Sequence, residues 1–246
     1  SLSRFNSWRT GYRIVSFFQF ALALCFLLTL PWWKLKVQKD GEENLKANVE
    51  PKATLAETLR QAKVWLSLCL FFTYVGAEVS IGTWSYSLLT ESRGIDATLA
   101  GYFVSSYWAT FTIGRIIAGF FVKKLGINTL VQASVATALV GTVLLIWNPS
   151  AWINLAAVAL IGFAIAPIFP SLMSGTRQRV GARFATNTIG MQIAFTGLGT
   201  VVIPSVLGIL ARHFTLEVIP FCLTVVFLLL FCLYRLSMQK ARAAEK

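Results

Sequence analysis

Charged side chains are scarce in this sequence. They make up 13% of the 246 residues, and only 10 residues are Asp or Glu, whereas about a quarter of the residues in a soluble globular domain are charged. Hydrophobic residues reach 56%, and the mean hydropathy is +0.68. This composition excludes an ordinary soluble domain and indicates a chain that lies mostly in lipid.

Histidine is nearly absent, and the cysteines are not arranged in pairs. His213 is the only histidine, and the four cysteines stand singly inside apolar runs, without a C-x-x-C pair. These residues predict no metal site. No nucleophile lies beside a base either, so we expect neither an enzyme nor a cofactor. The net charge of +12 does not indicate a nucleic-acid partner, because most basic residues lie in short gaps between apolar runs, as in membrane proteins.

Seven apolar runs have the length needed to cross a bilayer, or come close to it, since a span takes about 20 residues. Backbone groups in lipid must be hydrogen-bonded within their segment, so these runs should be helices. Asn148-Pro149-Ser150 predicts a turn within the longest uncharged stretch. The fold class expected is an all-α membrane protein, a polytopic helical bundle. The predicted spans are Ile14–Trp33, Val64–Thr90, Ala97–Val122, Asn128–Trp147, Ala151–Met173, Phe184–Leu210 and Val218–Tyr234.

Basic residues are unevenly divided between the two sides of this map. Of the 22 Lys and Arg residues, 17 fall on one side and 5 on the other. Positively charged loops stay in the cytoplasm. The C-terminus and residues 34–62 are therefore predicted to be cytoplasmic, in a multi-pass protein of the cell (inner or plasma) membrane.

One sizeable polar segment separates the first run from the other six. Its part Lys36–Glu50 mixes charges of both signs and predicts a flexible linker. Thr54 and Glu57 then have the spacing of a capping box, and Leu55 and Leu59 share a face. This pattern predicts a short amphipathic helix, although an ordinary solvated connector explains it equally well. The expected organisation is a preceding helix in residues 1–33, a central cytoplasmic loop in 34–62, a six-helix block in 63–238 and a cytoplasmic tail in 239–246.

One acidic residue, Glu78, lies near the middle of a predicted span. An ionisable side chain at membrane depth is costly unless it faces protein or water, and it is a functional candidate by default. Glu78 could carry a proton or bind a polar substrate. The alternative is a permanently protonated Glu that makes only a helix–helix hydrogen bond. Tyr74, one turn earlier on the same helix face, belongs to the same candidate site.

Other polar and aromatic side chains at membrane depth extend this candidate site. Trp108 is the one tryptophan near the middle of a span, and Tyr107 precedes it. A sugar can stack its C–H face on an indole beside hydroxyl groups. Gln192 and Asn187 place amides along the sixth predicted span. A space-filling Trp and interhelical hydrogen bonds are alternatives that the residues themselves leave open.

Several stretches resemble the C-terminal half of major facilitator superfamily transporters. The most specific are "FFTYVGAEVSIGTW" (Phe71–Trp84) and "ESRGIDATLAGYFVSSYWATFTIGRIIAGFFVKKLG" (Glu91–Gly126), which are most similar to fucose-permease-like sugar transporters with their Tyr-Val-Gly-x-Glu run. "APIFPSLMSG" (Ala166–Gly175) and "SWRTGYRI" (Ser7–Ile14) continue the likeness. The resemblance implies that the seven runs are helices six to twelve: the C-terminal six-helix half of the fold plus one preceding helix.

The superfamily's cytoplasmic signature, Gly-x-x-x-Asp-Arg-x-Gly-Arg, has an altered counterpart after the third predicted span. Gly119 matches it and Lys124 takes the place of the Arg, but Lys123 replaces the Asp. The acid-mediated contact that this signature makes in the family is therefore not expected here. Gly114 and Arg115 precede the signature, and the resemblance implies a structural or gating contact for Arg115 rather than a substrate ligand.

The resemblance implies a secondary active transporter, of which this chain is a fragment, with proton-coupled symport of a sugar or related small polar solute by alternating access. The implied partners are the lipid bilayer, the solute, a proton as the coupling ion and the missing N-terminal half. An exporter of hydrophobic or drug-like compounds is the alternative within the superfamily. A seven-helix receptor and a membrane scaffold that transports nothing are the alternatives outside it.

Overall fold

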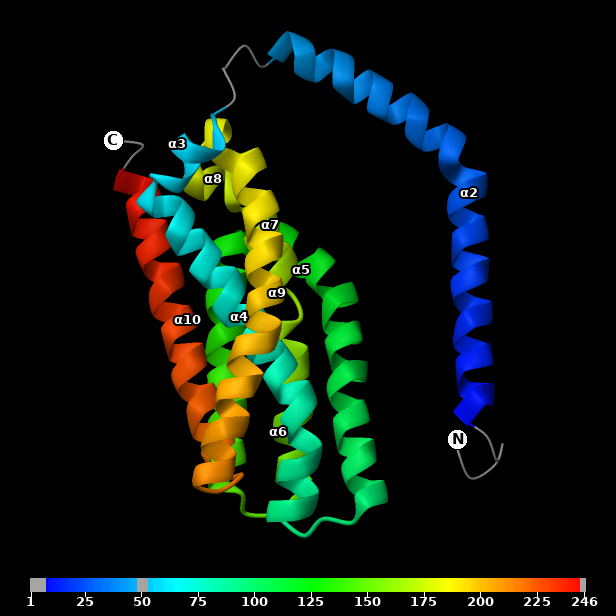
Figure 1. The fold of residues 1–246 in the computed structure, drawn as a ribbon, viewed down its shortest axis with the longest axis vertical. Helices are drawn as coiled ribbons and strands as arrows, with labels where there is room; N and C mark the ends of the chain where they lie inside the picture. Colours follow the sequence, from blue (N-terminus) through cyan, green and yellow to red (C-terminus); the bar gives the residue numbers. More distant parts are fainter. Residues whose placement is uncertain (1–7, 48–52, 244–246) are drawn as a thin grey trace. The chain divides into compact units, whose positions relative to one another are not determined.

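The computed structural model describes residues 8–47 and 53–243, which form helices joined by short turns, without a strand. The chain divides into two compact units, Ser1–Pro51 and Lys52–Lys246, and each is described by itself (Figure 1). The predicted all-α class is confirmed.

The first unit contains one long helix, α2 (Trp8–Ala47), which includes the first predicted span. Its stretch Thr10–Pro31 is long and apolar enough to cross a membrane. The helix then continues through residues 34–47, so the structure differs from the flexible linker predicted over Lys36–Glu50. The Lys, Gln, Glu, Leu and Ala residues of this stretch have high helix propensity, which explains why the helix continues here. Residues 48–52 lie outside the described part.

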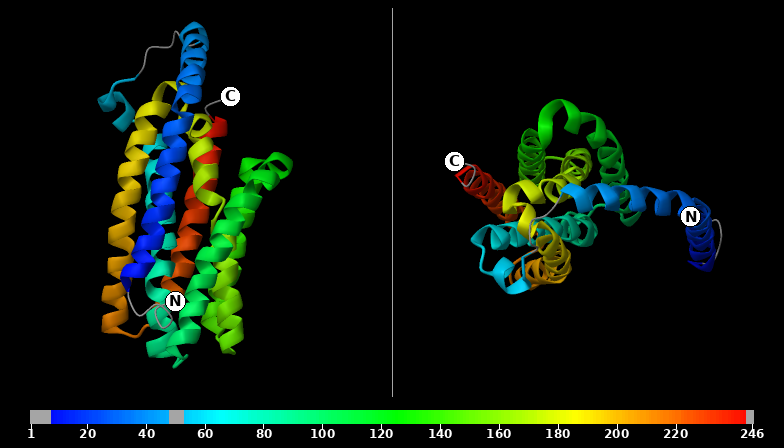
Figure 2. Two further views of the ribbon diagram at one scale, coloured as in Figure 1. Left: turned by 90° about the vertical axis from the view of Figure 1, so that its right-hand side faces the viewer. Right: turned by 90° about the horizontal axis from the view of Figure 1, so that it is seen from above.

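The second unit is a bundle of long helices that run side by side (Figures 1 and 2). A π-helical turn, η1 (Leu88–Ser92), extends the first of these helices. The helices are α3 (Leu55–Leu59), α4 (Ala62–Ser87), α5 (Ala97–Trp147), α6 (Ala151–Ile165), α7 (Ile168–Ser174), α8 (Thr176–Val180), α9 (Ala182–His213) and α10 (Val218–Ala243).

A sharp bend at Gly126 divides α5 into the third and fourth predicted spans. Gly126 has φ +75° and ψ 156°, a non-helical conformation inside an otherwise helical run. Glycine adopts a positive φ without the steric cost that a Cβ imposes. The two parts of α5 leave this bend as separate arms of the bundle (Figure 2).

Six helical stretches of the described residues are long and apolar enough to span a membrane, so this is a multi-pass membrane protein. The predicted span Ala97–Val122 is helical throughout but is not one of the six. It contains Arg115 and several hydroxyl residues, which lower its hydropathy. The count of seven spans therefore stays a prediction. The six stretches are Thr10–Pro31, Ala62–Ser92, Lys124–Trp147, Ala151–Ser174, Ala182–His213 and Val218–Lys240.

The turn predicted at Asn148-Pro149-Ser150 is confirmed. Asn148 ends α5 in the left-handed conformation, with φ 46° and ψ 48°, which Asn tolerates better than most residues. Ser150 then caps α6, because its Oγ accepts a hydrogen bond from the Ile153 backbone N–H. The two apolar spans on either side are thus separated by residues suited to ending one helix and starting the next.

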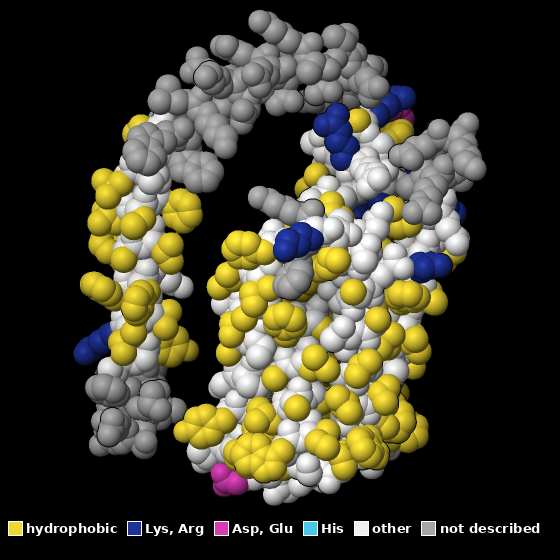
Figure 3. Space-filling view, turned by 180° about the vertical axis from the view of Figure 1, so that it is seen from behind, with side chains coloured by type: hydrophobic (Ala, Val, Ile, Leu, Met, Phe, Trp, Pro, Cys, Tyr) yellow, Lys and Arg dark blue, Asp and Glu magenta, His cyan; other side chains and the backbone are white. Residues whose placement is uncertain are grey.

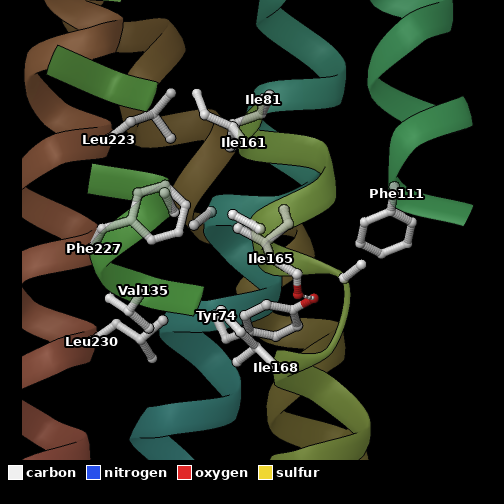
Figure 4. Packing of buried hydrophobic residues seen from close by; sticks show 14 of the residues in the cluster. Tyr74, Ile81, Phe111, Val135, Ile161, Ile165, Ile168, Leu223, Phe227 and Leu230 are labelled. Carbon is white, nitrogen blue, oxygen red and sulfur yellow. Dashed lines mark hydrogen bonds between the residues drawn. The ribbon is translucent and has the colours of Figure 1, made fainter. Parts of the chain in front are cut away.

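α4 lies in the middle of the bundle, with most of its length buried. It packs against α9 and α10, and α5 packs mainly against α6. Figure 4 shows the apolar core, in which Phe227 of α10 and Ile161 of α6 belong to the same cluster as Tyr74 of α4. Glycine permits the closest approach: a Cβ at Gly199 of α9 would collide with the Phe72 carbonyl oxygen of α4. The site therefore stands on a well-packed scaffold.

The predicted capping box at the start of α3 is confirmed. The Glu57 N–H donates to Thr54 Oγ1 at 3.3 Å, and the Thr54 N–H donates to Glu57 Oε2 at 3.4 Å. Leu55 and Leu59, one helical turn apart, are both exposed. Thr58 is the buried residue of this helix.

Candidate functional site

The carboxyl group of Glu78 on α4 faces the guanidinium of Arg115 on α5. Arg115 Nη2 lies 3.9 Å from Glu78 Oε1, close enough for electrostatic attraction but too far for a hydrogen bond. The Glu78 side chain is 15% exposed and the Arg115 side chain 48% exposed. Arg115 Cζ also lies 4.3 Å from the centroid of the Phe111 ring, a cation–π contact. The carboxyl is thus sheltered; its contact with Arg115 is loose, and the Tyr74 hydroxyl also interacts with it.

Two aromatic side chains of α5 complete this part of the site. Tyr107 is fully buried, and its hydroxyl donates to the Glu78 backbone oxygen at 2.9 Å. Trp108 is 46% exposed and meets Tyr107 edge to face, with ring centroids 4.9 Å apart. Gly82 gives this indole room, because a Cβ there would lie 2.8 Å from Trp108 Cζ2. A partly exposed indole therefore lies against α4 one helical turn beyond Glu78.

Tyr74 lies one turn before Glu78 and is fully buried. Its hydroxyl donates to the Ile165 backbone oxygen at 3.1 Å, the contact drawn in Figure 4. Ile165 is the last residue of α6, where the final carbonyls of a helix have no partner within it. Tyr74 therefore connects α4 to the break between α6 and α7.

Gln192, predicted for the same site, lies elsewhere. It is fully buried, and its Nε2 donates to Ser67 Oγ at 2.7 Å and to Thr176 Oγ1 at 3.1 Å. Ser67 precedes Glu78 on α4 by three helical turns, about 16 Å along the axis. The arrangement matches the interhelical hydrogen bond that was the alternative for Gln192, since it connects α9 to α4 and α8.

Asn187 lies nearer the start of α9 and holds α3. Its Nδ2 donates to the Ala53 backbone oxygen at 2.8 Å and to Thr58 Oγ1 at 3.1 Å. Nearby, Arg183 Nη2 lies 2.8 Å from Glu57 Oε2, with both side chains exposed. The structure does not bring Asn187 to Glu78, because its amide hydrogens are directed to α3.

The residues predicted for structural or gating contacts have different surroundings. A Cβ at Gly114 would lie 2.7 Å from the Phe163 carbonyl oxygen, so this glycine permits close contact between α5 and α6. Gly119 has open space around it, and Lys124 is exposed near the bend in α5. Arg115 alone among these residues belongs to the Glu78 site. Its structural or gating role stays a prediction.

A second acid–base pair, which no sequence pattern indicated, lies where η1 meets α5, α6 and the start of α10. Arg93 Nη2 lies 2.7 Å from Glu217 Oε2, and Arg93 Nε donates to Glu217 Oε1 at 2.9 Å. The guanidinium also donates to Asn154 Oδ1 at 2.8 Å and to the Leu145 backbone oxygen at 2.7 Å. The hydrogen bond from Arg93 lowers the pKa of Glu217 below its usual value, against a smaller opposing effect of burial, and Ser92 adds to the lowering.

A buried cation, Arg179, lies in α8. It is 2% exposed, and its Nη2 donates to the Leu172 backbone oxygen and to Thr176 Oγ1. Its Nε has no hydrogen-bond partner in the described part of the chain. Burial lowers the pKa of Arg179 to about 10, so the side chain remains charged at neutral pH.

The Glu78 site offers hydrogen-bonding, stacking and proton chemistry. Within residues 8–47 and 53–243, no three His, Cys, Asp or Glu side chains are grouped so that they could hold a metal ion. A carboxyl and a guanidinium can bind hydroxyl groups, an indole can stack on a sugar ring, and a carboxyl can take up a proton. These properties suit a polar, uncharged solute.

Comparison with known proteins shows the family. The profile of the Major Facilitator Superfamily matches residues 2–192 and residues 66–246, two overlapping matches that together cover nearly the whole chain. The chain belongs to the major facilitator superfamily, whose members have the fold of transporters rather than of enzymes.

The relatives include proteins named as sugar transporters. The chain is 33% identical over 175 residues to the sodium-dependent glucose transporter 1A of Mus musculus, with 67% of this chain and 40% of that protein covered. It is 26% identical over 193 residues to a putative glucose/galactose transporter of Helicobacter pylori, with 77% and 44% covered. Bypass of stop codon protein 6 of Saccharomyces cerevisiae is 26% identical over 199 residues, with 75% and 39% covered. The chain thus spans less than half the length of these relatives.

Solved structures show the same fold. The E. coli fucose:proton symporter matches with a TM-score of 0.59 and 21% identity, over 74% of this chain and 44% of that one. The same transporter in an outward conformation matches with a TM-score of 0.59 and 19% identity. The predicted resemblance to fucose-permease-like members of the superfamily is confirmed, and so is the predicted helical-bundle fold.

Proposed function

We propose that this chain is the C-terminal part of a secondary active transporter that moves a sugar or related small polar solute by alternating access. Its family and the names of its glucose-transporting relatives support this function. Since the chain spans 40% and 44% of the length of those relatives, we also propose that a complementary half forms the other wall of the binding site, near the middle of the membrane.

The observation that carries the proposal is the group Glu78, Arg115 and Trp108 on α4 and α5. Glu78 and Arg115 make no hydrogen bond to each other at 3.9 Å, so both keep hydrogen-bonding capacity for a solute. Trp108 adds a partly exposed indole one turn away. The solute's hydroxyls would bind the two charged groups while its apolar face stacks on the indole.

We propose the proton as the coupling ion and Glu78 as the group that binds it. Protonation would cancel the charge of this sheltered carboxyl and with it the attraction to Arg115, so that proton uptake and the position of the Arg115 side chain are linked. The name of the E. coli fucose:proton symporter supports a proton. The name of the mouse relative supports sodium as the alternative.

The experiment is uptake of radiolabelled glucose and fucose into proteoliposomes that contain the chain with its complementary half. We expect uptake driven by an inward proton gradient and its loss in Glu78→Gln, with sugar binding retained. Uptake driven by a sodium gradient alone would show that sodium, not the proton, is the coupling ion. Proton-driven uptake in Glu78→Gln would show that Glu78 does not carry the coupling proton. No sugar uptake, together with expulsion of a hydrophobic dye, would support the exporter.

We propose further that the C-terminus and residues 34–62 face the cytoplasm of a cell whose inner or plasma membrane holds the protein. The excess of basic residues on that side supports this orientation. A green fluorescent protein fused after Lys246 should fluoresce, whereas a periplasmic reporter enzyme at the same position should be inactive. The opposite result would reverse the orientation.

A further inference from the structure

A cavity of about 170 Å³ opens between the second part of α5 and the end of α10. None of the residues of the Glu78 site lines it. Four of its five lining residues among those the structure describes have polar side chains, and one of these is a guanidinium; none of the five is a carboxylate. The lining residues are Asn128, Gln132, Arg235, Met238 and Gln239.

Hydrogen bonds in the wall of the cavity orient its side chains, and some N–H donors there remain available to a ligand. The Tyr234 hydroxyl donates to Asn128 Oδ1 at 2.8 Å, which leaves the Asn128 amide hydrogens for another acceptor. Arg235 Nη1 donates to Gln132 Oε1 at 3.1 Å, one of the five N–H donors that a guanidinium has. A positive charge with spare planar donors, and with no carboxylate among the described lining residues, suits a phosphate group.

Exposed apolar side chains lead from this cavity along both helices. They recur every three or four positions, so each set forms one stripe on its helix. The stripe on α10 is Phe221, Val225, Leu228 and Cys232, and it continues to Arg235 and Gln239. The stripe on α5 is Ala136, Val140, Val143 and Trp147, and Gln132 precedes it.

The two helices stay side by side along these stripes. They pack against each other, and Thr224 Oγ1 of α10 donates to Thr142 Oγ1 of α5 at 2.9 Å. Both stripes lie in stretches apolar enough to span a membrane, Lys124–Trp147 and Val218–Lys240. Arg235 is close to the end of the second stretch, where lipid headgroups begin.

We propose that this cavity binds the headgroup of an anionic phospholipid, whose acyl chains lie along the stripes of α5 and α10. Arg235 contacts the phosphate, and Asn128 and Gln239 donate to its oxygens or to the headgroup beyond it. Free phosphate has the same chemistry at Arg235, but it would leave the adjoining apolar stripes without an occupant. The proposal does not depend on the transported solute.

The charge of this end of the bundle supports an anionic lipid. Arg177 and Arg179 lie in α8, which packs against α10, and Lys240 follows the cavity on α10. On the face of the second unit that Figure 3 shows, Lys and Arg side chains gather toward one end, hydrophobic side chains are spread over the remainder, and an acidic side chain lies at the opposite end. Basic clusters beside a span attract anionic lipids of the cytoplasmic leaflet.

The test is native mass spectrometry of the full chain after removal of lipid, titrated with phosphatidylglycerol. Phosphatidylcholine with the same acyl chains and inorganic phosphate are the second and third probes. We expect phosphatidylglycerol to bind best, and Arg235→Gln to weaken its binding about tenfold, because a charge-assisted hydrogen bond is lost. Gln132→Leu keeps the charge and is expected to have a smaller effect.

Arg177→Gln is the matched control, since it removes one exposed charge at the same end but outside the cavity. Equal losses in the two glutamine variants would overturn the site in favour of diffuse attraction, and so would unchanged binding in Arg235→Gln. If inorganic phosphate bound as tightly as phosphatidylglycerol, the proposal that the ligand is a lipid would be overturned. Thermal unfolding without added lipid verifies folding, and if Arg235→Gln does not fold, Arg235→Lys is expected to bind less tightly than the unaltered protein.

Discussion

Arg93 and Arg115 each face a glutamate on a neighbouring segment, yet their surroundings are opposite. The Arg93 side chain is 3% exposed, lies 2.7 Å from Glu217 and also donates to α6 and to the end of α5. Arg115 is 48% exposed, lies 3.9 Å from Glu78 and rests on the Phe111 ring. Four of the five N–H donors of the Arg93 guanidinium have fixed partners, whereas Arg115 makes no hydrogen bond to Glu78 at 3.9 Å.

This difference indicates that the Arg93–Glu217 contact is structural, whereas the Arg115–Glu78 contact can form and break. Removing a buried guanidinium leaves several acceptors without a partner, so the Arg93 contacts make one end of the second unit rigid. A loose, partly exposed pair costs little to separate. In the alternating access proposed above, rigid blocks move around a binding site; the Arg93 pair would belong to a rigid block and the Arg115 pair to the site.

The largest effect on stability is expected from Arg93→Gln. Loss of one partner of a fully buried ion pair costs about 3–5 kcal/mol. Because the Glu217 side chain is 38% exposed, we expect a loss at or below the lower end of this range, from the acceptors left without a partner at Glu217, Asn154 and Leu145. The measurement is unfolding in detergent followed by circular dichroism. Arg212→Gln, at an exposed position near the end of α9, is the control and should change stability by less than about 0.5 kcal/mol. An Arg93 variant as stable as this control would refute the structural role.

A smaller loss is expected from Gly82→Ala, which alters the contact between α4 and Trp108. The new methyl group would lie 2.8 Å from Trp108 Cζ2, and overpacking of this kind costs about 1–3 kcal/mol. We expect lower stability and weaker sugar binding. Gly101→Ala is the matched control, because nothing lies within 4 Å of its new methyl group and alanine favours the helix. Equal effects of the two substitutions would show that the position of the Trp108 indole does not depend on the absence of a side chain at Gly82.

The Arg93–Glu217 contact should also respond to acid. The folded-state pKa of Glu217 lies below its ordinary value of 4.5, chiefly through the hydrogen bond from Arg93. The stabilisation is therefore present above pH 4.5 and is lost as pH falls through the folded-state pKa. Stability measured between pH 6 and pH 3 should fall less steeply in Glu217→Gln. Parallel curves for the two proteins would contradict the contribution of Glu217.

The smallest effect on stability is expected from Arg115→Gln. A pair of this exposure and distance contributes about 0–1 kcal/mol, so the variant should unfold nearly as the unaltered protein does. Proton-driven sugar uptake should nevertheless be lost, with partial recovery in Arg115→Lys, which keeps the charge. A loss of stability as large as that of Arg93→Gln would show that the Arg115–Glu78 pair is also structural.

Local patterns predicted those features that depend on neighbours in sequence. The capping box of Thr54 and Glu57, the turn at Asn148 and the starts of α6 and α10 are set by residues a few positions apart, and all are present. Glu78 and Arg115 were both singled out, but their contact was not predicted. Gln192 and Asn187 were expected beside Glu78, because helical spacing gives depth in the membrane but does not identify the neighbouring helix.

The sequence by itself determined that this protein is a helical membrane protein of the major facilitator superfamily, because hydropathy and the Tyr-Val-Gly-x-Glu block are local properties. The tertiary structure alone decided which charged groups are fixed and which are free to change partner. Arg93 and Glu217 are 124 positions apart, and each lies in an unremarkable short turn. How many N–H donors of a guanidinium find partners depends on how many acceptors the packing of several helices brings around it. The periodicity along one helix does not contain that information.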